Sequence, residues 1–309
     1  MTQLNEKAAI VTGASRGIGR AIALRLAQDG FAVTVNYAGR ADDANAVVDE
    51  IVAAGGRAIA LQGDVASVQD CARLFDETEQ AFGGVDVVIN NAGVIQPGTT
   101  MLADTDDALY ERIFSINTRG TFNMLRLAAT RMRTGGRIVN FSTSVIGLAL
   151  PGYGVYAGSK AAVETFTNIF AKELRGKGIS VTAVAPGPTA TDLFLDGKPA
   201  ELVERLAQAA PLERLGTPED IANTVAFLVG PQGEWADAAG EWRDRLRTLI
   251  PCAGRNARPC GPPAAGRSPD MSPSPGGRHG VPRTGSRRTR RPRAAPVRRG
   301  RSTGTSAPC

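Results

Sequence analysis

Short runs of apolar residues alternate with longer segments of mixed polarity through residues 8–185. Residues 8–11 form the first run, and apolar side chains then return between residues 21 and 27 at the spacing of a helix. An unbroken apolar run is typical of a strand that is buried on both faces, as in a parallel sheet. The strand-like runs cover residues 8–12, 31–37, 57–62, 85–90, 137–142 and 179–185.

This alternation predicts an α/β fold, a doubly wound parallel sheet of the Rossmann type with helices on both faces. Residues 1–235 are a suitable length for one such domain. The sequence contains no apolar run of about 18 residues that could span a membrane. Residues 1–7 lack the apolar core of a signal peptide, and Cys71 is the single cysteine of residues 1–235. We therefore expect a cytoplasmic protein without a disulfide framework.

A glycine-containing turn joins the first predicted strand to the first predicted helix. Residues 12–19 have the spacing G-x-x-x-G-x-G, with Gly13, Gly17 and Gly19 as its glycines. Glycines let a backbone approach a phosphate closely, and a helix N-terminus offers unpaired N–H groups and a positive dipole end. The turn thus predicts a nucleotide-binding loop that also includes Ser15, Arg16 and Ile18. The alternative is a glycine turn without a ligand.

Tyr156 and Lys160 are four residues apart, which places them on the same face of a helix. A nearby ammonium group favours the phenolate and lowers the pKa of a tyrosine from about 10. A tyrosine tuned in this way could exchange a proton near neutral pH. Taken alone, the pattern also occurs by coincidence on helix surfaces, so its meaning depends on the other motifs.

Together these motifs resemble the short-chain dehydrogenase/reductase family, and in particular its 3-oxoacyl-acyl-carrier-protein reductase-like members. The resemblance covers residues 5 to about 235. Further motifs match in order along the chain. They are Asp64-Val65 after the third strand, Asn90-Asn91-Ala92-Gly93 after the fourth, Asn117 in a mid-chain helix, Ser144 after the fifth strand and Pro186-Gly187 after the sixth.

The resemblance implies hydride transfer between a nicotinamide and a carbonyl, with Tyr156 as the proton donor. Lys160 would lower the pKa of Tyr156 and bind the nicotinamide ribose. Ser144 would hydrogen-bond the carbonyl oxygen, and Asn117 would hold a water in a proton relay behind Lys160.

Two assignments within this set have alternatives. Ser142 and Thr143 are also hydroxyls in the right region, but Ser144 precedes Gly147 by three positions, as the catalytic serine of the family usually does. Tyr153 is a second tyrosine without a lysine four residues later, and we expect it to line the substrate pocket.

For the cofactor, the resemblance implies that Asp64 binds the adenine amino group and that the backbone of Thr189 holds the nicotinamide carboxamide. The alternative for Asp64 is a helix N-cap. The predicted cofactor-binding residues are Gly13, Ser15, Arg16, Gly17, Ile18, Gly19, Asn36, Arg40, Asp64, Val65, Asn91, Ala92, Gly93, Tyr156, Lys160, Pro186, Gly187 and Thr189.

Charge near the second strand indicates which nicotinamide cofactor binds. Sites that prefer NAD place an acid at the end of this strand to bind the ribose 2′-hydroxyl, and residues 33–37 end without one. Arg16 in the glycine loop and Arg40 beyond the strand could instead bind a 2′-phosphate through the planar guanidinium. We predict NADP(H), with a solvated loop charge as the alternative for Arg40.

The substrate is defined only as a class. Residues 189–198 are predicted to form a mobile lid segment, in which Leu193, Phe194 and Leu195 either flank an apolar substrate or pack internally. We expect a small-molecule carbonyl, either free or bound to an acidic acyl-carrier protein that Arg131 and Lys172 could contact. The family further implies a homo-oligomer, a dimer or a tetramer.

Residues 236–309 differ in character from the rest of the chain. They contain sixteen arginines, no lysine and four acidic residues, hence a net charge of +12, whereas the whole chain carries +6 and residues 1–235 carry −6. Pro, Gly, Ser and Arg dominate, which predicts a disordered tail. No metal site is predicted, because Cys252, Cys260, His279 and Cys309 match no zinc spacing.

A shift of reading frame is one hypothesis for this tail. Residues 240–247 are compatible with codons that, read one base later, encode Val-Asn-Gly-Gly-Ile-Ala and then a stop, and family members commonly end in such a segment. The last edge strand of the sheet would then be missing, with weakened folding, assembly and activity. Two other functions stay open, an impaired or non-catalytic NADP(H)-binding protein and a nucleic-acid binder acting through its arginines.

Overall fold

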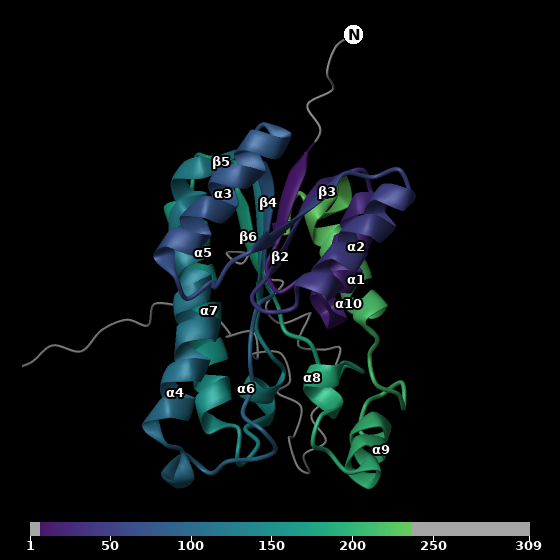
Figure 1. The fold of residues 1–309 in the computed structure, drawn as a ribbon. Helices are drawn as coiled ribbons and strands as arrows, with labels where there is room; N and C mark the ends of the chain where they lie inside the picture. Colours follow the sequence, from purple (N-terminus) through teal and green to yellow (C-terminus); the bar gives the residue numbers. More distant parts are fainter. Residues whose placement is uncertain (1–6, 237–309) are drawn as a thin grey trace, which may run out of the picture. The chain divides into compact units, whose positions relative to one another are not determined.

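A computed structural model describes residues 7–236, all within the first of two units of the chain, residues 1–256. It contains a parallel sheet between two layers of helices (Figure 1), so the predicted doubly wound α/β fold is confirmed. The strands are β1 (Ala8–Val11), β2 (Ala32–Tyr37), β3 (Ala58–Gln62), β4 (Val85–Asn90), β5 (Met132–Phe141) and β6 (Ser180–Val184). The helices are α1 (Gly17–Gln28), α2 (Ala41–Ala53), α3 (Val68–Phe82), η1 (Leu102–Asp104), α4 (Asp107–Ile113), η2 (Phe114–Arg119), α5 (Gly120–Arg131), α6 (Val145–Leu148), α7 (Gly154–Glu173), α8 (Asp192–Leu195), α9 (Ala200–Gln208), α10 (Pro218–Val229) and η3 (Pro231–Gly233).

The strand order fixes where a ligand can bind. The order is β3-β2-β1-β4-β5-β6, and every neighbouring pair is parallel. The chain builds outward from β1 to β3 and then crosses to the other side of β1 with β4. In a sheet of this kind, ligands bind in the crevice beyond the carboxyl ends of the strands at this switch point. The predicted loss of a further edge strand concerns residues outside the described range.

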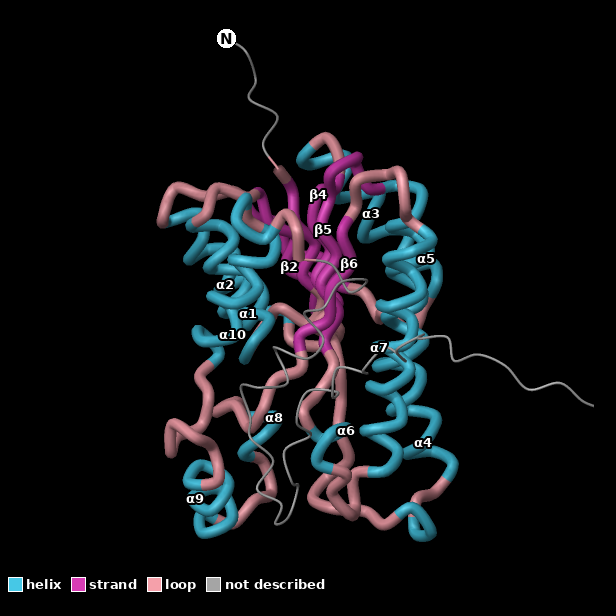
Figure 2. The backbone as a smooth tube through the Cα atoms, turned by 180° about the vertical axis from the view of Figure 1, so that it is seen from behind, coloured by secondary structure: helices cyan, strands magenta, loops and turns pink. Residues whose placement is uncertain are grey.

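Alternating side chains of the strands fill two hydrophobic cores, one on each face of the sheet. Ala9 and Val11 of β1 belong to the core under α1, α2 and α10, whereas Ile10 belongs to the core under α3, α5 and α7. Figure 2 shows the two helix layers on opposite sides of the strands. The apolar runs that predicted buried strands are thus buried on both faces. Within residues 7–236, no helix is long and apolar enough to cross a membrane.

Strand β5 begins earlier than its apolar run predicts. The expected start was residue 137, but Met132 already pairs with Val85, and the register shifts between Val85 and Val87 before regular pairing begins. Gly135 has a φ of 83° within this irregular stretch. The early part of the strand is polar and partly exposed, so hydrophobic pattern could not reveal it.

Candidate active site

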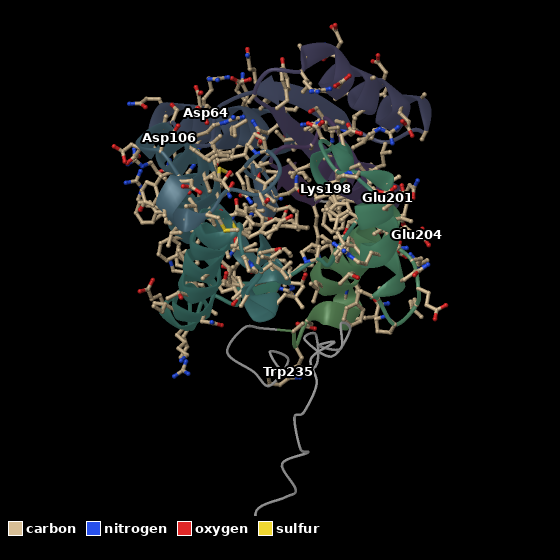
Figure 3. The ribbon with its side chains drawn as sticks, turned by 90° about the horizontal axis from the view of Figure 1, so that it is seen from below. Asp64, Asp106, Lys198, Glu201, Glu204 and Trp235 are labelled. Carbon is tan, nitrogen blue, oxygen red and sulfur yellow. The ribbon has the colours of Figure 1, made fainter. Side chains whose placement is uncertain are left out.

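The loops that follow β1, β2, β3 and β4 surround one cavity at the carboxyl end of the sheet. Figure 3 looks onto this end, with Asp64 and Lys198 labelled on segments that border it. The cavity has a volume of about 470 Å³. Its lining includes the predicted residues Gly13, Ser15, Arg16, Gly17, Ile18, Gly19, Asn36, Arg40, Asp64, Val65, Asn91, Ala92 and Gly93. It does not include Tyr156, Lys160, Pro186, Gly187 or Thr189.

The glycine loop has a shape that only glycines permit. Gly13 and Gly17 have φ values of 63° and 55°, in the left-handed region that other residues rarely adopt. A Cβ atom on Gly19 would lie 2.4 Å from the carbonyl oxygen of Gly13 and 2.5 Å from Nδ2 of Asn91. The three glycines therefore serve the close packing of the loop as well as the approach of a ligand.

Two asparagines hold this loop from either side. Asn36 accepts a hydrogen bond from the Gly13 amide (3.3 Å) and donates to the carbonyl of Gly63 (3.0 Å). Asn91 donates through Nδ2 to the carbonyls of Thr12 (2.8 Å) and Gly13 (3.1 Å). Both residues line the cavity, but their side chains support the loop, a role that sequence reasoning missed.

The N-terminus of α1, with Gly17, Ile18 and Gly19, borders the cavity. Arg16 occupies the N-cap position without a side-chain cap, and the first turn of α1 contains no acidic residue. Arg40 lines the same cavity and forms an ion pair with Asp43 at 3.1 Å. Beyond β2 the lining continues with Ala38 and Gly39. Backbone, helix dipole and two guanidinium groups therefore fit a dinucleotide that carries an extra phosphate.

Asp64 is not the helix N-cap that the sequence left open as an alternative. Ser67 caps α3 by accepting a hydrogen bond from the Asp70 amide, whereas Asp64 accepts one from the Ala66 amide at 2.9 Å. The neighbouring Val65 is buried, and its carbonyl accepts a hydrogen bond from Asn123 at 3.0 Å. Asp64 thus lies exposed at the cavity, next to Val65, which is held by its burial and by the hydrogen bond from Asn123.

Asn117, Lys160 and Gly93 converge beside the cavity. A Cβ atom on Gly93 would lie 3.3 Å from both Oδ1 of Asn117 and Nζ of Lys160. Oδ1 of Asn117 accepts a hydrogen bond from the Val94 amide (2.8 Å), and Nδ2 donates to Oγ of Ser159 (3.0 Å). Because Gly93 lines the cavity, Asn117 and Lys160 lie directly beside it.

Asn117 lies in η2, a π-helical turn between α4 and α5, within the mid-chain helix that the sequence predicted. Its carbonyl accepts a hydrogen bond from the Thr121 hydroxyl at 2.9 Å. Such turns are rare and often occur at functional sites. No feature of the sequence pattern predicted this local widening.

Lys160 is buried on α7, and its Nζ donates to the carbonyl of Phe141 at 2.8 Å. Burial disfavours the charged ammonium form and lowers the pKa of Lys160 to about 8.

Tyr156 corrects one expectation from the sequence. We expected Lys160 to lower the pKa of Tyr156, but burial raises that pKa, and proximity to Tyr153 raises it further. A hydrogen bond with the Thr143 hydroxyl opposes these effects and lowers the pKa. The reason is local, because the ammonium of Lys160 is directed to the carbonyl of Phe141. The phenol therefore stays protonated at neutral pH.

The three neighbouring hydroxyls after β5 have different surroundings. Ser142 donates to Oε1 of Glu164 at 2.8 Å, and Thr143 is the hydroxyl that hydrogen-bonds Tyr156. Ser144 precedes α6, and its amide donates to the carbonyl of Pro186 at 3.1 Å. From the sequence we weighed Thr143 against Ser144 and chose Ser144 as the hydroxyl that bonds the substrate carbonyl. This role of Ser144 stays a prediction.

Thr189 is fixed by the loop before α10. It is buried, its hydroxyl donates to the Gly187 carbonyl at 2.9 Å, and it pairs with Gly216 in an isolated parallel bridge. The loop after β6, which carries Pro186 and Thr189, also adjoins the hydroxyls after β5, because the Ser144 amide donates to the carbonyl of Pro186. The backbone of Thr189 therefore has a defined orientation beside the site.

The predicted lid segment, residues 189–198, contains the short helix α8. Thr191, Asp192 and Leu193 line the cavity, and Asp192 forms an ion pair with Arg16 at 3.3 Å. Sequence reasoning missed this pair, because nothing in the local pattern links two residues 176 positions apart.

Comparisons with known proteins agree with this site. A family model described as "Enoyl-(Acyl carrier protein) reductase" matches residues 13–238. A short-chain type dehydrogenase/reductase of Picea abies is 45% identical over 243 residues, which are 76% of this chain and 90% of that protein. An NADPH-dependent aldehyde reductase-like protein of Arabidopsis thaliana, named as chloroplastic, is 43% identical over 75% of this chain and 90% of its own length.

A solved structure has the same fold. It is a short chain dehydrogenase from Burkholderia cenocepacia in complex with NADP, with a TM-score of 0.71 and 36% sequence identity. The match covers 76% of this chain and 94% of that chain.

Proposed function

This chain belongs to the short-chain dehydrogenase/reductase family of oxidoreductases, and within it we propose an NADPH-dependent reductase of a small-molecule carbonyl. The observation that carries the proposal is the convergence of Asn117, Lys160 and Gly93 at the edge of the cavity. Tyr156 lies one helical turn before Lys160 on α7. A proton donor and a nucleotide-binding loop thus belong to one site.

The protein side chains would act mainly on the carbonyl oxygen. When bound, the nicotinamide supplies a hydride to the carbonyl carbon. Tyr156 donates its proton to the oxygen, which develops negative charge as the hydride arrives. The raised pKa of Tyr156 keeps the phenol protonated at neutral pH, the state that a proton donor needs.

Ser144 and Thr143 have separate roles in this proposal. Ser144 hydrogen-bonds the carbonyl oxygen of the substrate and supports its negative charge. Thr143 holds the phenol of Tyr156 in place through the hydrogen bond between their hydroxyls.

Lys160 and Asn117 support the other side of the reaction. Lys160 binds the nicotinamide ribose, and with a pKa of about 8 it can pass a proton toward Tyr156. Asn117 fixes Val94 and Ser159 with its side-chain amide, and we retain its predicted contact with a relay water as part of the proposal.

Preference for NADPH is supported by charge. Arg16 and Arg40 line the cavity beside Ala38 and Gly39, the positions just after β2 where an acid would bind an unphosphorylated ribose. Relatives support the same choice, since one is named an NADPH-dependent aldehyde reductase-like protein and another was solved with NADP.

We propose a free apolar carbonyl compound as the substrate. Leu193 and Leu195 of the lid segment are exposed, in keeping with an apolar flank for the substrate. Arg131, a candidate contact for an acyl-carrier protein, is paired with Asp76 (2.7 Å) and Glu79 (2.6 Å). Its charge is thus largely neutralised, and a carrier protein is less favoured than a small ketone or aldehyde.

The test is to follow NADPH absorbance with the full chain and a panel of aldehydes, cyclic ketones, 3-oxoacyl thioesters and enoyl thioesters. We expect turnover of carbonyl compounds and none of enoyl thioesters. Tyr156→Phe should abolish turnover and keep NADPH binding, because the phenol contributes a proton and the cavity lining is unchanged. Binding of NADPH without turnover of any carbonyl by the unmodified chain would instead support the non-catalytic alternative.

A further inference from the structure

An ion pair between Arg16 and Asp192 joins the glycine loop to the lid segment in the wall of the cavity. Nη1 of Arg16 lies 3.3 Å from Oδ2 of Asp192, and both residues line the cavity. A Cβ atom on Gly17 would lie 3.5 Å from Cγ2 of Thr191, so the two segments lie close together. The ion pair is therefore part of a broader contact between loop and lid.

Asp192 places a carboxylate in the wall of the cavity, beside the arginine that we propose binds a phosphate. Carboxylate and phosphate oxygens bind a guanidinium through the same donors. Arg40 pairs with Asp43 near the start of its own helix α2, whereas Arg16 reaches across the cavity for its partner. Arg16 can thus bind either the carboxylate of Asp192 in the lid segment or a phosphate group of a bound cofactor.

We propose that Asp192 is a specificity-determining residue, which competes with the 2′-phosphate of NADPH for Arg16 and so limits the preference for NADPH over NADH. The proposal rests on the proposed function, because it assumes a cofactor with a 2′-phosphate. Binding of that phosphate would release Asp192, and with it one tether of the lid segment. NADH lacks the 2′-phosphate that would compete with this carboxylate.

The expected size of the effect follows from exposure. The side chains of Arg16 and Asp192 are 43% and 76% exposed, so the pair is screened by water and salt. Loss of an exposed pair changes an equilibrium by about two- to five-fold. Asp192→Asn should therefore raise the ratio of the Kd for NADH to the Kd for NADPH by about two- to five-fold at low ionic strength.

Asp196 offers a matched control. It lies four residues later in the same exposed segment, and the ion pair of Arg16 is with Asp192 instead. Asp196→Asn removes the same charge from the lid segment without touching Arg16. We expect it to leave the ratio of the two Kd values unchanged, as measured by fluorescence titration of the full chain with each cofactor.

A double substitution tests the pairing itself. In an Arg16→Gln background, Asp192→Asn should leave the ratio of the two Kd values unchanged, because the guanidinium that the substitution would free is absent. Limited proteolysis without a cofactor gives a second readout. Chymotrypsin should cut after Phe194 faster in Asp192→Asn and in Arg16→Gln than in the unmodified chain.

The inference is overturned if Asp192→Asn leaves the ratio unchanged while NADPH still binds, or if Asp196→Asn raises it equally. An equal effect of Asp192→Asn with and without Arg16 would also overturn it. Failure of the unmodified chain to bind either NADPH or 2′,5′-ADP is a different result, because it refutes the proposed function itself.

Discussion

Lys160 is buried, and burial disfavours the charged form of its ammonium group. The side chain is 4% exposed, and its Nζ bonds a carbonyl. A buried charge paired only with a neutral group costs stability, and the pKa of about 8 reflects that cost. The charge gives the fold no stability, which agrees with the role that we propose for Lys160 in the reaction.

Lys160→Met should therefore stabilise the protein while it abolishes reduction. We expect the free energy of unfolding at pH 7 to rise by about 1–3 kcal/mol. The folded pKa of about 8 lies below the unfolded value of 10.5, so the unmodified protein gains stability as the pH rises through this interval. The difference between the two proteins should then shrink, as urea unfolding at pH 7 and pH 10 would measure. A less stable variant at pH 7 would contradict this account.

Thr143 should control the pKa of Tyr156. Thr143→Val removes the hydrogen bond that lowers this pKa, so the tyrosine should titrate at higher pH, and Thr143→Ser should restore the original value. The measurement is a difference absorbance titration against Tyr156→Phe. Ser144→Ala is the matched control, expected to lower kcat about 10²- to 10³-fold without changing the titration. If Ser144→Ala shifts the titration and Thr143→Val lowers kcat without shifting it, the roles of the two hydroxyls are the reverse of those proposed.

At the scale of elements, buried polar side chains tie α7 to the sheet. Asn90 at the end of β4 donates to Asn140 of β5 at 2.8 Å, and Asn140 donates to Thr167 of α7 at 2.8 Å. Hydrogen bonds of this kind fix register more strictly than apolar packing does, because an unpaired buried amide costs about 1–3 kcal/mol. The helix that carries Tyr156 and Lys160 is thereby held in one position over the sheet.

The glycine loop allows a matched pair of substitutions. Gly19→Ala would bring a Cβ atom to 2.4 Å from the Gly13 carbonyl, whereas a Cβ atom on Gly39 has no neighbour within 4 Å. We expect Gly19→Ala to lower the free energy of unfolding by about 1–3 kcal/mol and to weaken NADPH binding at least tenfold. Gly39→Ala should change stability by less than about 0.5 kcal/mol. Thermal unfolding and cofactor titration would check both, and equal effects would refute the steric argument.

At the scale of the whole molecule, α5 and α7 expose apolar side chains on neighbouring helices. Phe122 and Ile169 are 45% and 52% exposed, and the ring of Phe122 lies 6.3 Å from that of Phe166. Surface of this kind is typical of an interface between subunits. We propose that this face pairs two copies of the chain, as the family resemblance implies.

Ile169→Glu should dissociate such a pair, because it would bury a charge at the interface. Size-exclusion chromatography with light scattering should give a smaller mass than for the unmodified chain. Val52→Glu is the matched control, since Val52 is 54% exposed on α2, in the helix layer on the other face of the sheet. An unmodified chain that is already a monomer, or equal masses for all three proteins, would exclude this interface.

The sequence by itself determined the fold class, the glycine loop and most of the residues around the cavity. These features are local, since a buried strand, a glycine turn and a helix each follow from neighbouring residues. The parallel topology then brings the carboxyl ends of the strands together, and with them the predicted residues.

Only the tertiary structure decided how individual side chains behave. Residues from different elements are joined by the hydrogen bond between Thr143 and Tyr156 and by the ion pair of Arg16 with Asp192. The hydrogen bonds by which Asn36 and Asn91 support the glycine loop also connect separate elements. The raised pKa of Tyr156 and the lowered pKa of Lys160 depend on burial, which the packing of α7 on the sheet sets. Spacing along the chain places two residues on one helix face, but desolvation and partners from distant segments decide their charge.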